Sequence, residues 1–201
     1  VCTLYFGSAA AAAWVTPAAA MAGAALGMAV LLLLSGAASS LVTFILAGAV
    51  LNVAAGAGVS LALSLAPDAW AVAEITNWLM GSLADRSRDD LLLGAPFILL
   101  GCAVLLTLGR GLDALTLGET TARSLGVDLS ALRLRLAAGV ALATGASVAV
   151  TGVIGFVGLI TPHLLRPLVG ARPGALLLPS AMAGAALTLA ADIGVRLTPA
   201  A

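Results

Sequence analysis

Few side chains in this sequence are able to do acid–base or nucleophilic chemistry, and they are far apart. His163 is the single histidine, and no cysteine or carboxylate lies near it at a metal-ligand spacing. Cys2 and Cys102 stand alone in apolar runs and make neither a disulfide framework nor a metal motif. The sequence therefore predicts no catalytic centre, no cofactor and no metal ion.

Two polar pairs have the spacing of neighbours on one helix face. His163 and Arg166 are three residues apart, and Asp192 and Arg196 are four apart with the acid first. The first pair is either a polar gate or cytoplasmic contact, or a pair whose side chains reach the lipid headgroups. The second is either a surface ion pair or an arginine that meets an acidic partner protein.

Glycines are frequent, but they do not form a nucleotide-binding pattern. Gly152, Gly155 and Gly158 recur at every third residue, yet they open no strand–helix unit. The sequence contains no Walker A motif either. If this protein uses ATP, we therefore expect the ATPase to be a separate subunit.

The elements that must position these side chains follow from an extreme composition. Of the 201 residues, 62% are hydrophobic and 9% are charged, and the mean hydropathy is +1.16. A soluble domain carries roughly 25% charged residues, so this chain must be dissolved in lipid. Nine basic residues balance nine acidic ones, which leaves no charge excess to attract a nucleic acid.

Seven apolar segments are separated by polar breaks, and each must be a helix, because a helix satisfies its own backbone hydrogen bonds. Their approximate bounds are 1–14, 18–35, 41–65, 91–109, 132–151, 155–169 and 175–194. Small pairs at helical spacing, Gly23 with Gly27 and Ser180 with Gly184, either bring helix backbones close together or reflect a GC-rich codon bias. The predicted fold class is all-α, a polytopic transmembrane helical bundle forming one domain over 1–201.

The arginines orient this bundle. If residues 110–131 are cytoplasmic, six arginines lie inside and three outside, as the positive-inside rule requires. The inner ones are Arg110, Arg123, Arg133, Arg135, Arg166 and Arg172, and the outer ones are Arg86, Arg88 and Arg196. We therefore expect residues 67–90 outside the cell and residues 111–130 in the cytoplasm.

The outer stretch predicts a short helix that lies on the bundle. Asp68 is the expected N-cap and Gly81 the expected C-terminal stop. Trp70 and Trp78 suit the membrane interface, where an indole buries its ring and still hydrogen-bonds. The alternative is an irregular loop anchored by the same two tryptophans.

The inner stretch predicts two short helices joined by a tight turn. Thr116 and Glu119 have the spacing of a capping box, which predicts a helix over about 117–125 that stops at Gly126. Asp128 is able to cap the helix that follows. The apolar residues of this stretch are Leu115, Leu117, Leu125 and Val127. They suit docking on a partner and packing against the bundle equally well.

Five blocks of sequence in one register resemble the FecCD family of ABC importer permeases, which serve ferric siderophores, haem and cobalamin. The blocks are 77–82, 115–126, 151–166, 178–185 and 191–196. The resemblance implies a bundle like a type II ABC importer permease, with about seven of ten expected spans present. Because the chain also opens without an initiator Met or a basic leader, we expect it to be truncated at both ends.

The resemblance also implies partners in a bacterial inner membrane. These are ABC ATPase subunits in the cytoplasm, a substrate-binding protein outside, and a second permease copy or homologue. The implied ATPase contacts are Leu117, Gly118, Glu119, Ala122, Arg123, Leu125 and Gly126. Arg196 matches the family's outer arginine, which meets an acidic residue of the binding protein. His163 and Arg166 stay open between a gate and a cytoplasmic contact.

The expected function is import of a metal chelate by alternating access, powered by ATP hydrolysis on the partner. The first alternative is a secondary transporter without an ATPase, which would want an acidic residue in mid-span for ion coupling. The second is an intramembrane enzyme that uses His163 with Thr161 or Ser147. Such an enzyme needs several ionisable groups at membrane depth, and here only His163 and Arg166 approach that.

Overall fold

The computed structural model describes residues 15–36, 41–84 and 86–198, and these residues form nine α-helices and no strand. The all-α class predicted from the sequence is confirmed. The helices are grouped in two compact units. The first unit comprises Val1–Cys102 and Ala137–Val153, and the second comprises Ala103–Leu136 and Ile154–Ala201. Each unit is described by itself below.

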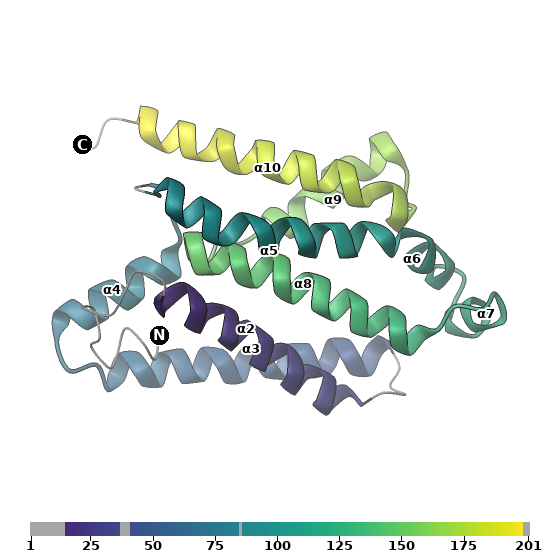
Figure 1. Cartoon of the computed structure of the whole chain (residues 1–201), viewed down its shortest axis with the longest axis horizontal. Coiled ribbons are helices and arrows are strands. Elements are labelled where there is room, and N and C mark those ends of the chain that lie inside the picture. The colour runs from purple at the N-terminus through teal and green to yellow at the C-terminus, as the bar shows by residue number, and fades with distance from the viewer. Residues whose placement is uncertain (1–14, 37–40, 85, 199–201) are drawn as a thin grey trace. The chain divides into compact units, whose positions relative to one another are not determined.

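The first unit is a group of long apolar helices with one short helix at an end (Figure 1). It contains α2 (Val15–Ser35), α3 (Leu41–Ser64), α4 (Ala69–Met80), most of α5 (Arg88–Thr107) and the second half of α8 (Leu129–Thr151). Helix α2 packs against α3. The short helix α4 follows the C-terminal end of α3 (Figure 1).

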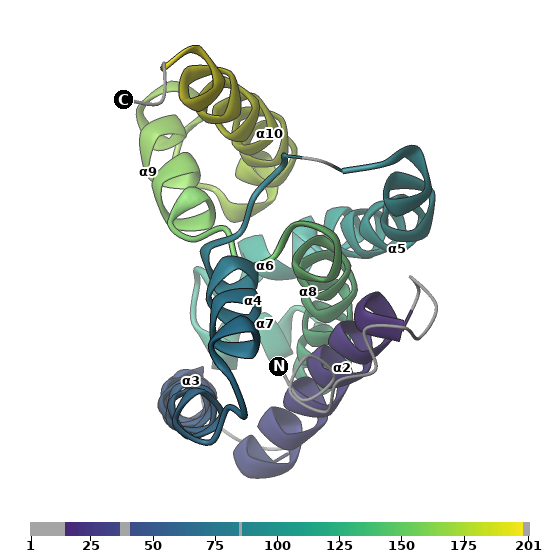
Figure 2. The ribbon, with the colours of Figure 1, turned by 90° about the vertical axis from the view of Figure 1, so that its left-hand side faces the viewer.

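The second unit combines short helices with one long one. It contains α6 (Gly109–Leu115), α7 (Glu119–Ser124), α9 (Val157–Val169) and α10 (Pro173–Leu197), together with the adjoining ends of α5 and α8. Helix α10 packs against α9 and α6, and α6 also contacts α7. Helices α9 and α10 lie side by side in both views (Figures 1 and 2).

Among the described residues, five helices are long and apolar enough to cross a membrane, namely α2, α3, α5, α8 and α10. They correspond to five of the seven predicted segments, and the segment predicted over 1–14 lies outside the described residues. The remaining segment, 155–169, forms the shorter apolar helix α9 of 13 residues. A helix of that length rises only about 20 Å, so α9 does not span a bilayer by itself.

The helix is shortened because the chain unwinds between α8 and α9. Gly152 has a φ of 74° and Phe156 a φ of 65°. Phe156 is the N-cap of α9, and its side chain makes no capping hydrogen bond. Since a left-handed backbone conformation cannot continue a right-handed helix, these two residues end α8 and start α9 as separate elements.

Small residues bring α5 and α8 close together in the first unit. A Cβ atom added to Gly94 would lie 2.7 Å from Val150 Cγ2. One added to Gly101 would lie 2.6 Å from the backbone nitrogen of Ala143 and 2.7 Å from the carbonyl oxygen of Gly139. Any side chain at Gly101 would therefore push the two backbones apart.

The two pairs of small residues at helical spacing differ in whether they face a neighbouring helix. At Gly23 and Gly27, a Cβ atom would meet no described neighbour within 4 Å, so among the described residues no helix approaches closely at this pair. On α10, a Cβ atom at Gly184 would lie 3.5 Å from Val157 Cγ1 of α9, so Gly184 faces α9 at an ordinary van der Waals distance. Ser180 Oγ, one turn earlier, is buried.

The predicted helix of the 67–90 stretch is confirmed as α4. Asp68 Oδ1 accepts a hydrogen bond from the backbone N–H of Ala71 at 2.7 Å, as an N-cap does. At the other end Gly81 has a φ of 63° and terminates the helix. Trp70 is exposed and Trp78 is half-buried.

Main-chain atoms join the end of α4 to the end of α8, and we call this contact the α4–α8 junction. The N–H of Ser82 donates to the carbonyl of Thr151 at 2.7 Å, and the N–H of Val153 donates to Trp78 at 3.4 Å. A Cβ atom at Gly152 would overlap the carbonyl oxygen of Trp78. The absence of a side chain at this position therefore permits the junction to form.

Candidate partner-docking sites

The 111–130 segment of the second unit is folded on a small apolar core of its own. The buried members of this core are Leu108, Ala122, Leu129 and Leu132, and Leu105, Leu112, Ala114, Leu115, Val127 and Leu136 pack against them. These residues come from α6, α7 and the adjoining ends of α5 and α8. The core therefore holds the two short helices against the start of α8.

Helix α7 ends in a Schellman motif, as the stop predicted at Gly126 requires. The N–H of Gly126 donates to Arg123 at 2.9 Å, and the N–H of Val127 donates to Ala122 at 3.1 Å. Gly126 has a φ of 84°, and Gly118, the N-cap of α7, has a φ of 96°. Both positions are left-handed, so a side chain at either would strain the backbone even though the space around both is open.

The predicted capping box at the start of α7 is wrong. Thr116 is the C-cap of α6 with helical φ and ψ of −65° and −20°, and its hydroxyl donates to the carbonyl of Asp113 at 2.7 Å. An N-cap needs an extended backbone to present its side chain forward, and Thr116 does not have one. Helix α7 accordingly runs over Glu119–Ser124, shorter than the predicted 117–125.

Asp128 is the predicted cap of α8, and this prediction is confirmed. Its Oδ1 accepts from the N–H groups of Ser130 and Ala131 at 2.9 and 3.0 Å. The sequence reading missed a reciprocal box at the start of α5. There Asp90 Oδ2 accepts from the N–H of Ser87 at 2.9 Å, and Ser87 Oγ accepts from the N–H of Asp90 at 3.1 Å.

Glu119 forms an ion pair with Arg133 of α8. Arg133 Nη2 donates to Glu119 Oε1 at 2.9 Å, and the side chain of Arg133 is 14% exposed while that of Glu119 is 31% exposed. This charge-assisted bond attaches the first residue of α7 to the beginning of α8. Arg133 was not among the predicted site residues, because 14 positions separate it from Glu119 and no local pattern links them.

The apolar residues of the segment divide between its core and its surface. Leu115 and Val127 pack against the core, whereas Leu117 and Leu125 are each 62% exposed. Packing against the bundle is therefore confirmed for Leu115 and Val127, and docking on a partner stays a prediction for Leu117 and Leu125. Ala122 is fully buried, so it supports the surface from beneath.

The surface of the segment thus offers two leucines and one cation. The guanidinium of Arg123 is exposed on α7, between the positions of Leu117 and Leu125 in the sequence. Two exposed apolar side chains and one cation on a segment that is held by a buried core are able to fill pockets of a partner at small entropic cost.

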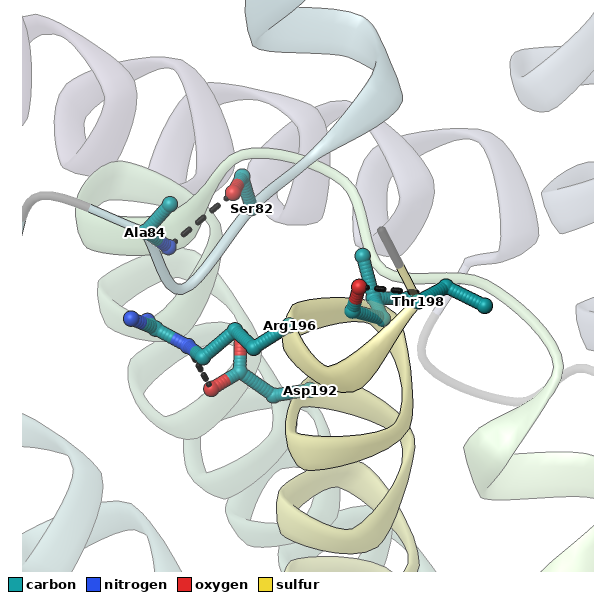
Figure 3. Close-up of polar contacts among 6 residues, drawn as sticks. Ser82, Ala84, Asp192, Arg196 and Thr198 are labelled. Atoms are coloured by element: carbon teal, nitrogen blue, oxygen red, sulfur yellow. Dashed lines mark hydrogen bonds and ion pairs between the residues drawn. The ribbon is translucent and has the colours of Figure 1, made fainter. Parts of the chain in front are cut away.

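At the far end of α10, Asp192 and Arg196 form the predicted helical pair (Figure 3). Arg196 Nε donates to Asp192 Oδ2 at 2.8 Å, and the arginine side chain is 56% exposed. The hydroxyl of Thr198 donates to the carbonyls of Gly194 and Val195 at 3.0 and 2.8 Å and closes the last turn. Figure 3 also shows Ser82 Oγ of the first unit accepting from the N–H of Ala84 at 3.0 Å.

His163 and Arg166 are both exposed on α9 and line one hollow of about 560 Å³. Its other lining residues are Gly158, Leu159, Ile160, Pro162 and Leu164. The hollow therefore has an apolar wall with two polar nitrogen-bearing side chains. A gate or cytoplasmic contact at this pair stays a prediction.

The hydroxyls proposed for an intramembrane enzyme are engaged in their own helices. Thr161 Oγ1 donates to the carbonyl of Val157, and Ser147 Oγ donates to the carbonyl of Ala143 at 2.8 Å. Within the described ranges, no group of three or more histidine, cysteine or carboxylate side chains is placed to hold a metal ion. Cys102 is a free, half-buried thiol of α5.

Comparison with known proteins places the chain beside membrane permeases. A profile of the FecCD transport family matches residues 1–200. The hemin transport system permease protein HmuU of Yersinia pestis is 40% identical over 157 residues, 78% of this chain and 47% of its own length. The vitamin B12 import system permease protein BtuC of Vibrio cholerae is 42% identical over 154 residues, 76% of this chain and 46% of its own length.

A solved structure has the same fold. It is an inward-facing conformation of a transporter described as a metal-chelate type ABC transporter, with a TM-score of 0.78 and 36% sequence identity. The match covers 86% of this chain and 56% of that one. The chain thus spans about half the length of the curated relatives it matches.

Proposed function

This chain belongs to the FecCD transport family, and on that premise we propose that it supplies membrane-spanning helices of an ABC importer permease. The proposed cargo is a metal chelate, namely a ferric siderophore, haem or cobalamin. The names of the haemin and vitamin B12 permeases support this cargo class. The chain is a multi-pass protein of the bacterial inner membrane.

In the proposed mechanism the chain performs no covalent chemistry. ATP binds to and is hydrolysed by partner ATPase subunits in the cytoplasm, and the permease alternates between outward-open and inward-open states. A second permease copy or homologue completes the pathway between the subunits. The relatives named above are permease proteins of a hemin transport system and of a vitamin B12 import system, which supports assigning the membrane-spanning part to this chain.

The observation that carries the proposal is the surface of the 111–130 segment. Leu117 and Leu125 are exposed while the other apolar residues of the segment pack on its core. The predicted contacts Gly118 and Gly126 set the turns that present these leucines, and Glu119 is fixed by its ion pair. We propose that the ATPase binds this surface through an apolar pocket with an acidic residue placed for Arg123.

The outer contact proposed for the binding protein is Arg196. It lies in the last turn of α10, a helix of 25 residues that rises about 37 Å from its first residue near α6. Its pair with Asp192 is exposed, so an acidic residue of a partner is able to compete for the guanidinium at small cost.

Photo-crosslinking tests the inner contact. The protein is produced from its own chromosomal locus with benzoylphenylalanine at Leu125, and the crosslinked products are identified by mass spectrometry. We expect a product that contains a protein with a Walker A motif, Gly-x₄-Gly-Lys-Ser/Thr. Benzoylphenylalanine at Leu134, which is 57% exposed on α8, is the matched control and should not give that product.

Two results would contradict the proposal. One is a Walker A protein missing from the products at Leu125 or captured equally at both positions. The other is chelate uptake that survives ATP depletion and stops when the ion gradient is collapsed, which would establish the secondary-transporter alternative.

A further inference from the structure

Asp113 of α6 makes a hydrogen bond to a residue 61 positions away in the sequence. Its Oδ1 accepts from the backbone N–H of Gly174 at 2.7 Å. Asp113 is half-buried, and Gly174 follows Pro173, the first residue of α10.

The bond gives α10 an N-cap that its own sequence lacks. The residue at the N-cap position, Arg172, makes no side-chain capping hydrogen bond, and Pro173 has no N–H. The N–H of Gly174 is one of the amides that a helix leaves unsatisfied at its start. A carboxylate there also interacts favourably with the positive end of the helix dipole, so Asp113 supplies from α6 what Arg172 does not.

The two helices also approach closely at this point. A Cβ atom at Gly174 would lie 2.8 Å from Asp113 Oδ2 and 2.9 Å from the carbonyl oxygen of Gly109. A Cβ atom at Gly109 would lie 3.2 Å from Gly174 Cα. The contact is therefore a specific one, in which two glycines permit the approach and one carboxylate fixes it.

This contact connects the two proposed docking sites within one unit. Helix α6 shares the core of the 111–130 segment through Leu112 and Leu115, and that core also holds α7. Gly174 and Arg196 belong to the same helix, α10, which contains Pro179 in its first half. A displacement of α7 is thus able to reach the outer end of α10 through packed side chains, Asp113 and a single helix.

We propose that Asp113 is a positioning residue that holds α6 on the start of α10 and relays movement between the ATPase-facing surface and Arg196. This inference rests on the proposed function. In this scheme α10 moves when the ATPase binds or hydrolyses nucleotide, and this movement reaches the side where the binding protein docks. Docking of the binding protein moves the same helix and so affects the ATPase. Asp113 itself contacts neither partner in this scheme.

Cysteine labelling at both ends of this path tests the relay. The protein, produced from its own locus and isolated with its partner subunits in nanodiscs, carries either Ser124→Cys on α7 or Val195→Cys on α10. Both residues are exposed, and Cys2 and Cys102 are replaced in the same background. Rates of maleimide labelling are compared without nucleotide and with ATP plus vanadate.

We expect nucleotide to change both rates in the otherwise unaltered protein. Asp113→Ala should reduce the nucleotide-dependent change in labelling rate at position 195 by about fivefold, the factor that corresponds to a lost N-cap. The change in labelling rate at position 124 should stay the same. Gly174→Ala should do the same without removing a polar group. Asp113→Asn keeps an acceptor oxygen and should retain most of the response at 195.

Two matched controls separate the relay from general damage. Asp68→Ala removes an N-cap bond of the same length from α4, and Gly194→Ala adds a methyl group to α10 where no described neighbour lies within 4 Å. Both should leave the change at 195 intact. If either control lowers it as far as Asp113→Ala does, the relay is refuted.

The relay is also refuted if nucleotide changes the labelling rate at position 195 fully in both Asp113→Ala and Gly174→Ala. It is refuted as well if, in the unaltered protein, nucleotide changes the labelling rate at position 124 but not at position 195. Should Asp113→Ala not reach the membrane, Gly174→Ala and Asp113→Asn carry the same comparison. A failure of position 124 to respond to nucleotide in the unaltered protein would instead contradict the proposed ATPase coupling.

Discussion

Contacts between elements that are distant in sequence are built from different chemical groups in the two units. The α4–α8 junction of the first unit consists of main-chain hydrogen bonds made possible by Gly152. In the second unit, the 111–130 segment adds to its apolar core two carboxylate contacts, Asp113 toward Gly174 and Glu119 toward Arg133.

This difference has a physical consequence. Main-chain groups have fixed positions, so the α4–α8 junction either forms completely or the chain must shift. Carboxylate contacts involve side chains that are partly exposed and able to change rotamer. Breaking such a contact therefore costs less free energy than breaking the main-chain junction. The first arrangement suits a fixed part of the protein, and the second suits a part that moves with a partner.

The largest effect is expected at the α4–α8 junction. Gly152→Ala should lower the free energy of unfolding by more than about 3 kcal/mol, because its Cβ would overlap the Trp78 carbonyl and its backbone is left-handed. Gly170 has a similar φ of 95°, but the space around it is open. Gly170→Ala should therefore lower the free energy of unfolding by only about 1–2 kcal/mol. Thermal unfolding in detergent measures the loss of stability in both variants. Equal losses would show that the overlap at the α4–α8 junction adds nothing to the cost of the left-handed backbone.

An intermediate effect is expected at the ion pair. Glu119→Arg places a second cation beside Arg133 and should cost about 1–2 kcal/mol of stability while chelate uptake falls at least about tenfold. The protein should still insert in the membrane, as immunoblots of washed membranes will establish.

The exchange of both charges sharpens this prediction. Glu119→Arg combined with Arg133→Glu should restore stability, because the pair can form in reverse. If uptake returns as well, Glu119 acts by positioning α7. If uptake stays low, Glu119 contacts the ATPase directly. A double variant as unstable as Glu119→Arg would contradict the assigned ion pair.

The smallest effect on stability is expected at the outer end of α10. Arg196→Ala should change the free energy of unfolding by less than about 0.5 kcal/mol, because an exposed pair four residues apart contributes little. The affinity for the binding protein should nevertheless fall about tenfold. Asp192→Ala breaks the same pair but leaves the arginine, so it should preserve that affinity. Equal losses in both variants would argue against docking through Arg196.

The features that the sequence predicts well are those whose signal lies within a few residues. Apolar runs locate the long helices because lipid requires every such run to be helical. The caps at Asp68 and Asp128 and the stop at Gly126 follow from groups three or four positions apart. The family resemblance is confirmed by a profile match over residues 1–200.

Contacts are not predictable from the sequence where a residue has two available partners or a distant one. Thr116 and Glu119 have the spacing of a capping box, but Thr116 bonds to the preceding turn and Glu119 to Arg133. The partner of Asp113 is 61 residues away, beyond any local pattern. Gly101 similarly gives no sign in the sequence that it faces α8, because only the packing of two helices selects it.

The proposal with the widest consequences is that the exposed leucines of the 111–130 segment couple this chain to an ATPase. Leu117→Asp combined with Leu125→Asp, introduced at the chromosomal locus, tests it through uptake of radiolabelled ferric siderophore, haemin and cobalamin. We predict that uptake of the transported chelate falls at least about tenfold with an unchanged amount of protein in the membrane. Replacing both leucines by methionine should preserve uptake, since the apolar surface is kept. Full ATP-driven uptake by the double aspartate variant would contradict the account.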